Sequence, residues 1–583
     1  ELFINGTKML PAGFKKHGAK LLLRFLGIAM CGIIGVLTKE GNAGKLAYEG
    51  IKRLDYRGYD SWGIAVKGSG LSIYKRTGKI GSIPNKLLQG SIAIAHTRWA
   101  THGRPSQLNA HPHTDCKGEI ALVHNGIIEN AEALREELDG HDFKSETDSE
   151  VIAHLIEEEI KDGREFFEAF VNTIRRLRGS YAIAAIYLGE PNRIFCARNE
   201  SPLIVGVGVD SAFCASDPLV LKGFADEMYA LEDNQVAVLT PGDLSVFSIE
   251  GEVRRVRPRK ISLEGFTEYV KLKRSDGTAT LEEIREIPHV LLNTLKLGEE
   301  SLLKAAEMIL KAENVYIVAS GTSYHAGLVA KYYLSKLAYV NASPYIASEF
   351  PYWAKLDKRD LIITISQSGE TADVISVLKQ AKREKVKILS IINVPGSTID
   401  RMSDYTLYIN AGPEVGVAAT KSYVNQLSVE LQLAVKLNEE LGYEDKGLYK
   451  DIVKEIRRVA NAASFFISTY TPLIKDLARE ISIKQSAYYL GRGLHLATSL
   501  EGALKLKELS YVHAEGYPAG ESKHGPIALV EEGFPTLFTG SSSEAKHELM
   551  GNIEEMKARR AWTIAVSDDD DILELVDVGI RMP

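Results

Sequence analysis

The chain has 583 residues, a formal net charge of -7, 45% hydrophobic residues and 25% charged residues. This composition is typical of a folded protein with several domains and excludes a disordered or fibrous chain. An acidic chain with Lys and Arg interspersed does not favour nucleic acid as a partner. Four cysteines are too few for a disulfide framework, and no apolar run approaches the roughly 18 residues of a membrane helix. We therefore expect a cytoplasmic protein without a membrane or nucleic-acid partner.

The first thirty residues precede the segment in which the fold is expected to begin. They start at Glu1 and contain a short apolar run that Arg24 interrupts, with no small-residue cleavage site after it. We interpret residues 1–30 as a non-native extension or propeptide, and we place the functional start at Met30.

Residues 31–250 alternate short β-rich runs with helical stretches at 43–54 and 148–160. The runs read CGIIGVL, SIAIAHT, EIALVHNG and SYAIAAIYLG. This alternation predicts an α+β domain with stacked sheets. The charged residues that follow, at 251–300, predict a linker.

From residue 301 the pattern changes to strand, turn and helix in regular order. The strands NVYIVAS, DLIITIS and KVKILSIIN are continuously apolar, which indicates a parallel sheet covered by helices on both faces. The same order recurs further on, with serines 541–543 in the place of the first copy's serine-rich turn at 366–368. We predict two doubly wound α/β domains, at 301–445 and 470–583. The second ends directly after a strand, so we expect it to be truncated.

Cys31 is the first candidate for chemistry. Removal of Met30 would give it a free α-amine with a pKa near 7.7–8.0, so that one residue would hold both a nucleophile and its base. The plainer interpretation is a small buried residue in a first strand.

Three downstream motifs favour the chemical interpretation. HTRWATHGRP at 96–105 offers a guanidinium and an indole for a carboxylate ligand. HNGIIEN at 124–130 offers an amide and a backbone N–H for an oxyanion. SETDSE at 145–150 offers a carboxylate at a helix start, either as a cap or for an ammonium group.

Together with RLDYRGYDSWG at 53–63, these motifs resemble the glutaminase domain of class II (N-terminal nucleophile) amidotransferases. The family commonly has Glu and Ala where this chain has Asp55 and Trp62. The resemblance implies an αββα sandwich, with Cys31 as nucleophile and with Asn125 and Gly126 as the oxyanion hole. It further implies a glutamine-binding set in which Trp99 gates the ammonia path: Arg98, Trp99, His102 and Asp148.

The segment HPHTDC at 111–116 could pass for a metal cluster through His111, His113 and Cys116. Structural zinc requires four ligands at suitable spacing, and the related NAHPH segment occurs in the metal-free family. We therefore expect neither a metal nor a cofactor.

Two loops of the first α/β domain indicate a phosphate site. SGTSYHAG at 320–327 and SQSGETAD at 366–373 each lead from an apolar strand into a helix, where backbone N–H groups attract anions; the alternative is ordinary helix capping. Neither has a dinucleotide or P-loop spacing. The loops resemble those of sugar isomerase (SIS) domains. Their tandem arrangement behind a glutaminase domain resembles the glutamine:fructose-6-phosphate amidotransferase family. The resemblance implies a sugar-phosphate site formed by Thr322, Ser323, Ser366, Gln367, Ser368, Thr371 and Val417.

The stretch from Leu500 to Pro526 supplies the remaining candidates. Glu501, Lys505 and Glu508 share one helix face, in isolation an ordinary row of ion pairs. By resemblance Glu508 moves a proton between adjacent sugar carbons, Lys505 assists at the sugar hydroxyls, and His524 opens the sugar ring from a neighbouring subunit. The family also ends in a tail with a Schiff-base lysine, which this sequence lacks.

The expected activity is synthesis of glucosamine 6-phosphate from fructose 6-phosphate and glutamine by a homodimer. One alternative is a SIS-type regulator with an inactive or uncoupled glutaminase. A phosphoribosyl pyrophosphate amidotransferase is disfavoured because its diphosphate-binding signature is absent.

Overall fold

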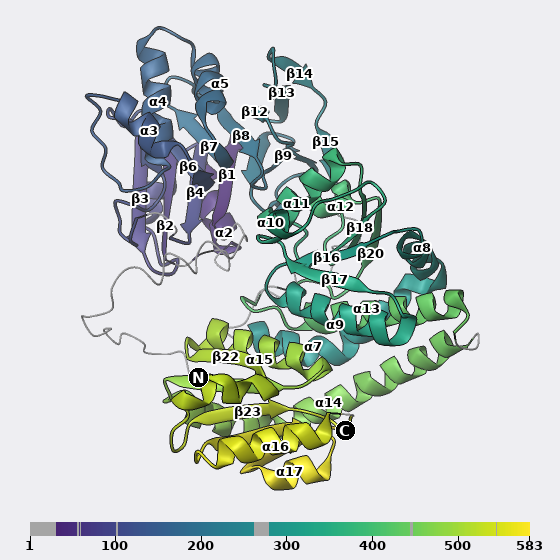
Figure 1. The fold of residues 1–583 in the computed structure, drawn as a ribbon. Coiled ribbons are helices and arrows are strands. Elements are labelled where there is room, and N and C mark those ends of the chain that lie inside the picture. Colours follow the sequence, from purple (N-terminus) through teal and green to yellow (C-terminus); the bar gives the residue numbers. More distant parts are fainter. Residues whose placement is uncertain are drawn as a thin grey trace. The chain divides into compact units, whose positions relative to one another are not determined.

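The computed structural model describes residues 31–54, 58, 60–100, 103–261, 279–414, 416–443, 447–543 and 545–583 (Figure 1). The chain divides into two compact units, and the described residues of these are 31–261 and 279–583. His102 and Asp55 lie outside the described residues. No helix among the described residues has the length and apolar character needed to cross a bilayer.

The first unit contains two antiparallel sheets. The eight-stranded sheet has the order β15 (Arg259–Ile261), β11 (Glu227–Ala230), β9 (Ile204–Gly208), β10 (Ser211–Ala215), β1 (Gly32–Thr38), β4 (Ile92–Arg98), β2 (Ser61–Lys67) and β3 (Leu71–Thr77). The seven-stranded sheet has the order β14 (Arg254–Val256), β13 (Asp243–Ser248), β12 (Gln235–Thr240), β8 (Ile194–Asn199), β7 (Gly179–Tyr187), β6 (Ile120–Ile128) and β5 (His113–Thr114). The helices of this unit are α2 (Ala43–Lys52), α3 (Ala131–Glu137), α4 (Glu150–Lys161), α5 (Phe166–Arg176) and α6 (Pro218–Leu221).

The two sheets pack face to face, and helices cover their outer faces. Because successive side chains of a strand point to opposite faces, Ile33 of β1 enters the core between the sheets and Ile34 enters the core beneath α2. A third core lies between the seven-stranded sheet and helices α3 to α5, and includes Phe170. The predicted αββα sandwich is confirmed. Trp62 is fully buried in the α2 core beside Tyr48 and Tyr74.

The second unit contains two parallel sheets of five strands (Figure 1). The first has the order β17 (Ala342–Ile346), β16 (Val315–Ala319), β18 (Leu361–Ser366), β19 (Lys387–Ile392) and β20 (Tyr405–Tyr408). Its helices are α7 (Ala279–Asn293), α8 (Gly298–Leu310), α9 (Thr322–Ala338), α10 (Phe350–Trp353), α11 (Ala372–Arg383), α12 (Thr398–Met402) and α13 (Lys421–Leu441).

The second parallel sheet repeats the strand order of the first. It runs β22 (His513–Pro518), β21 (Ser486–Gly491), β23 (Pro535–Thr539), β24 (Trp562–Ser567) and β25 (Val578–Arg581). Its helices are α15 (Leu494–Ser510), α16 (Lys546–Lys557) and α17 (Asp570–Leu575). The predicted duplication of a doubly wound unit is confirmed.

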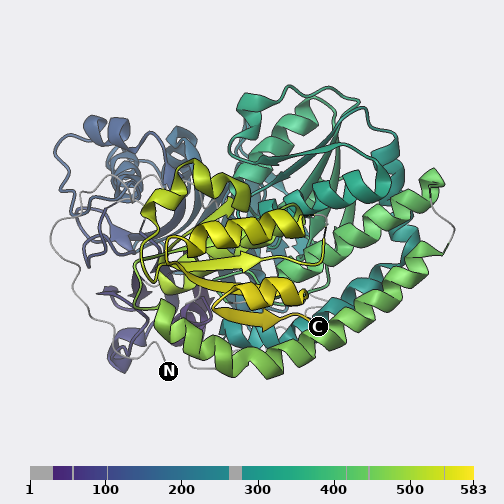
Figure 2. The same ribbon diagram turned by 60° about the horizontal axis from the view of Figure 1, so that its bottom comes forward.

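A long helix, α14 (Leu448–Ile481), links the two copies (Figure 2). Its first half packs on α7 through Ile456 and Leu291. Its last turns pack on one face of the second sheet, where Leu477 and Ile481 pack against β24. Apolar residues at both ends therefore join the two sheets into one unit.

The structure differs from the expected linker at 251–300. Residues 254–261 form β14 and β15, which extend one sheet each by antiparallel pairing. Helix α7 packs on the first α/β domain, where Asn425 donates to the carbonyl of Val290. The side chains of Arg254 and Arg255 on the edge strand β14 are exposed, so their charge is compatible with strand pairing, and weak hydrophobic periodicity hides such strands.

Candidate functional site

Cys31 lies immediately before β1, beside the end of the neighbouring strand β4. The backbone N–H of Trp99 donates to the Cys31 Sγ at 3.3 Å, and the Sγ lies 3.6 Å from the Trp99 carbonyl oxygen. Burial raises the pKa of the Cys31 thiol to about 11, although the Trp99 N–H and the Arg98 charge oppose this rise. The thiol is therefore protonated at neutral pH and requires a base.

Asn125 is held against Cys31 from the other sheet. Its amide Nδ2 donates to the Cys31 carbonyl at 2.9 Å, and its Oδ1 lies 2.9 Å from His96 Nε2. Burial lowers the pKa of His96 to about 3, so this imidazole is neutral and Nε2–H donates to Asn125. The His96 contact thus fixes the amide orientation, and sequence reasoning did not single out this histidine.

Gly126, the next residue of β6, has a backbone that suits only glycine. Its φ is 129°, and a Cβ at this position would lie 2.0 Å from the carbonyl oxygen of Ser180. Side chains are strained in this region. The oxyanion-hole candidates Asn125 and Gly126 are therefore adjacent on one strand, with a local geometry that tolerates no side chain at the second position.

The charged candidates converge on the same place. Arg98, at the end of β4, is buried and donates to the carbonyl of Gly103 at 3.1 Å. Asp148 accepts from the N–H of Ile128 at 2.7 Å, which holds it against the end of β6. Arg98 and Asp148 are near enough to Cys31 for their charges to act on its pKa. A cation and an anion therefore flank the thiol.

The sequence offered His111, His113 and Cys116 as possible metal ligands. In the structure the two histidines contact other residues. His111 stacks on His96 and accepts from the His124 N–H, while His113 Nε2 lies 3.1 Å from Thr147 Oγ1. Burial lowers the pKa of both rings. Cys116 instead lies beside His141 and His154.

The phosphate-site candidates lie at the switch point of the first parallel sheet. Strand β16 leads into α9 at Thr322 and Ser323, and the adjacent strand β18 leads through the loop 366–371 into α11. In a sheet of this order, ligands bind where connections leave in opposite directions. Ser323 is buried and accepts from Gln426 Nε2 at 3.1 Å.

The loop 366–371 is organised by its own hydroxyl groups. Ser366 Oγ accepts from the Gly369 N–H at 3.0 Å and lies 3.2 Å from Thr371 Oγ1. Ser368 Oγ accepts from the Glu370 N–H at 3.1 Å. Thr371 stands at the N-cap of α11 without a side-chain cap bond, so the helix start leaves N–H groups for an anion.

Residues of the second α/β domain meet this site through α15. Lys505 Nζ donates to Thr322 Oγ1 at 3.0 Å and to Glu508 Oε2 at 2.6 Å. Glu501 Oε1 accepts from Thr322 at 3.0 Å, and its Oε2 lies 2.7 Å from His325 Nδ1. The structure thus joins Lys505 and Glu508 to the β16 loop. Sequence reasoning missed His325, because only tertiary packing opposes it to Glu501.

Two candidates stand apart from this cluster. Val417 is 57% exposed in the segment before α13, and His524 is exposed in the short helix η4 (Ala519–His524). Within the described residues, no hydrogen bond or ion pair joins His524 to Lys505 or Glu508.

Two family models match parts of this chain. A profile described as "Glutamine amidotransferase domain" matches residues 96–222, and one described as "SIS domain" matches residues 308–436 and 480–582. The C-terminal domain of glucosamine-fructose-6-phosphate aminotransferase from Francisella tularensis is 34% identical, covers 52% of this chain and 88% of that chain, and has a TM-score of 0.47.

Two curated relatives match almost the whole chain. A protein named glutamine–fructose-6-phosphate aminotransferase (isomerizing) from Thermococcus kodakarensis is 42% identical over 564 residues, covering 95% of this chain and 93% of the relative. One of the same name from Pyrobaculum aerophilum is 44% identical over 566 residues, with the same coverage. The chain belongs to the family of glutamine–fructose-6-phosphate aminotransferases (isomerizing).

Proposed function

We propose that this chain makes glucosamine 6-phosphate from fructose 6-phosphate, with glutamine as the nitrogen source. The observation that carries the proposal is the 42% identity to a relative of that activity over 95% of the chain. This alignment spans both the unit that holds Cys31 and the unit that holds Lys505. The product enters amino-sugar biosynthesis.

The first half of the reaction takes place at Cys31. Its sulfur attacks the side-chain amide carbon of glutamine, and the oxyanion is stabilised by the Asn125 amide and the Gly126 N–H. Arg98 pairs with the substrate carboxylate and Asp148 with its ammonium group. The amide nitrogen takes the thiol proton, which the α-amine of Cys31 relays, and leaves as ammonia; water then hydrolyses the thioester to glutamate. Trp99 and His102 complete the glutamine site.

The second half takes place where α9 and α15 meet. The phosphate binds to the loops that carry Ser323 and Thr371, together with the serines and glutamine of 366–368, and Val417 lines the sugar. Ammonia, carried inside the protein, condenses with the C2 carbonyl. Glu508 then removes a proton from C1 and returns it to C2, which turns the ketose into an aldose. Lys505, 2.6 Å from Glu508, hydrogen-bonds the sugar hydroxyls.

Isotope transfer tests this proposal. A chain that starts at Met30 is supplied with fructose 6-phosphate, glutamine labelled with ¹⁵N in its side-chain amide, and excess unlabelled ammonium. We expect label in glucosamine 6-phosphate and stimulation of glutamate release by the sugar phosphate. A Cys31→Ala variant should lose the label transfer and retain synthesis from ammonium. A chain that binds the sugar phosphate and makes neither glutamate nor amino sugar would instead be a SIS-type regulator.

We also propose that the active form is a cytoplasmic homodimer in which His524 opens the sugar ring in the neighbouring copy. Its exposure in η4 suits such a role. Mixing a His524→Ala chain with a Lys505→Ala chain should restore up to about a quarter of the wild-type activity. About half of the dimers are then mixed, and each mixed dimer contains one intact composite site out of two. Two inactive variants that stay inactive when mixed, in verified mixed dimers, would refute the shared site.

A further inference from the structure

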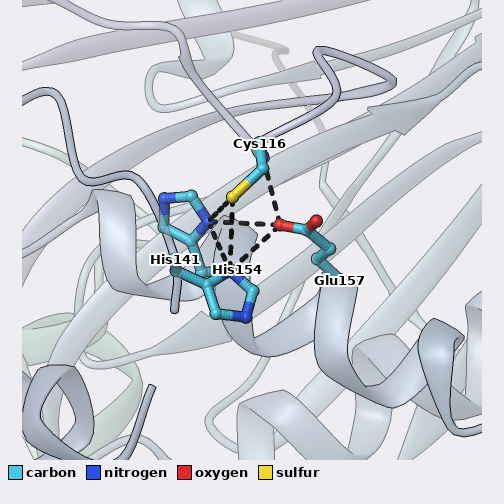
Figure 3. Close-up of side chains that lie close together, drawn as sticks. All are labelled: Cys116, His141, His154 and Glu157. Atoms are coloured by element: carbon cyan, nitrogen blue, oxygen red, sulfur yellow. Dashed lines mark hydrogen bonds and ion pairs between the residues drawn. The ribbon is translucent and has the colours of Figure 1, made fainter. Parts of the chain in front are cut away.

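Four potential metal ligands from separate segments converge in the amino-terminal unit (Figure 3). Cys116 lies in the turn after β5, His141 in the loop after α3, and His154 and Glu157 on successive turns of α4. Each side chain directs one donor atom to a common point, and these atoms all lie within 4.8 Å of one another. The cluster lies outside the set of residues assigned to glutamine chemistry.

The distances between the donor atoms are those of a tetrahedral coordination shell. Cys116 Sγ lies 3.4 Å from His141 Nδ1 and 3.6 Å from His154 Nδ1, and the two nitrogens are 3.1 Å apart. Glu157 Oε2 lies 3.1 Å and 3.3 Å from these nitrogens. These five distances average about 3.3 Å, and a regular tetrahedron with edges of that length has its centre roughly 2.0 Å from each corner, which is the length of a Zn–N bond.

His141 has a carboxylate on its outer side. His141 Nε2 lies 2.7 Å from Glu158 Oε1, a contact that favours the tautomer with the proton on Nε2 and the lone pair of Nδ1 directed to a ligand. His154 Nε2 is buried and, among the described residues, has no hydrogen-bond partner; Glu150 Oε1 lies 3.8 Å from it. A carboxylate behind a ligating histidine is the usual second partner of such a ligand. The two Nδ1 atoms lie 3.1 Å apart, close enough for one cation to be bound by both.

The cluster is buried. The side chains of His141 and His154 are each 1% exposed and that of Glu157 is 6% exposed, so water contributes little to balancing the carboxylate and the ring nitrogens, and a bound cation would do so.

We propose that Cys116, His141, His154 and Glu157 form a structural zinc site. Sulfur, two imidazoles and one carboxylate in tetrahedral array suit Zn²⁺. Four protein ligands leave no open position, so the metal stabilises structure and does not activate water.

The site fastens the segment between α3 and α4 to the β5–β6 turn. That segment carries Asp148, the carboxylate assigned to the glutamine ammonium group. Cys116 and His141 are 25 residues apart, and His141 and His154 are 13 apart, so one metal closes two loops. Loss of the metal should therefore lower the thermal stability of this unit and weaken glutamine binding, while ammonia-dependent synthesis in the other unit is retained.

Metal analysis of the full chain tests the proposal. The protein is incubated with ZnSO₄, dialysed against metal-free buffer and measured by plasma mass spectrometry and zinc X-ray absorption. We expect one zinc per chain, with one sulfur and three nitrogen or oxygen neighbours. A wild-type chain that retains no zinc, or a zinc with a different ligand set, would overturn the proposal without any variant.

Variants identify the ligands. Cys116→Ala and His154→Ala should each lower the retained zinc to background, whereas Cys196→Ala, at another buried cysteine of the same unit, should retain one zinc per chain. If a ligand variant does not fold, Co²⁺ replaces Zn²⁺ in the wild-type chain, and the visible spectrum should show tetrahedral, thiolate-bound cobalt. Zinc retained at full stoichiometry in a folded Cys116→Ala chain would refute the assignment.

Discussion

A residue inserted ahead of Cys31 tests the acid–base chemistry of the glutaminase half. In a chain that starts at Met30, insertion of a lysine between Met30 and Cys31 prevents removal of the methionine, so that the Cys31 nitrogen stays in an amide. Burial raises the pKa of the thiol to about 11. At pH 7 such a thiol is ionised in only on the order of one molecule in 10,000. A free α-amine, with a pKa near 7.7–8.0, is the base that overcomes this deficit.

The insertion should lower kcat for glutamine hydrolysis by about 10²–10⁴-fold, the usual contribution of general base catalysis. Ammonia-dependent formation of glucosamine 6-phosphate should stay at the parent rate, because Lys505 and Glu508 lie in the other unit. Glutamate release and amino-sugar formation are measured side by side. The matched control is the same chain without the insertion. If mass spectrometry shows that the insertion is retained and hydrolysis still proceeds at the control rate, the α-amine is not the base.

Three further changes probe the positions of individual groups. Gly126→Ala places a Cβ 2.0 Å from the Ser180 carbonyl oxygen and should lower glutaminase kcat by about 10²–10³-fold, the effect of a lost oxyanion donor. The control is Gly118→Ala, which is also at positive φ but has open space around it. It should cost about 1–2 kcal/mol of stability and leave kcat unchanged. Glu501→Gln weakens the contacts that join α15 to α9 and should lower the free energy of unfolding, measured in urea, by about 1.5–3 kcal/mol; a change within error would contradict a bridging role. Burial lowers the pKa of His96 to about 3, so its contribution to stability is complete above pH 6.5. This contribution is lost as the pH falls from 6.5 towards 3, by about 1.4 kcal/mol per pH unit. The stability of a His96→Gln chain should fall less steeply over this range, and identical pH profiles of the two proteins would contradict the assignment.

Local sequence determined the classes of element and their order. The continuously apolar strands NVYIVAS and DLIITIS predicted a parallel sheet, and β16 and β18 are its two central neighbours. The runs around Cys31 and His96 predicted stacked sheets, and β1 and β4 pair within one of them. These predictions rest on periodicity, which each segment carries by itself. Edge strands β14 and β15 lack such periodicity, so the sequence predicted a linker in their place.

Site candidates that follow strands could also be found from sequence, because strand ends gather at one edge of a sheet. Thr322 and Ser366 illustrate this: Ser366 ends β18, Thr322 begins the helix that follows β16, and the two strands are adjacent. The partner of Thr322 could not be found in this way. Glu501 lies 179 residues further on, and only the packing of α15 on α9 brings the two together.

The cluster around Cys116 is a second case in which sequence spacing did not identify the residues that make contact. Sequence proximity pairs Cys116 with His111 and His113, whereas folding pairs it with His141 and His154, which lie 25 and 38 residues away. The amino-acid order alone specified which residues could ionise, donate or ligate. Which of them face each other depends on how helix α4 and the β5–β6 turn pack around a shared core, a property that no single segment contains.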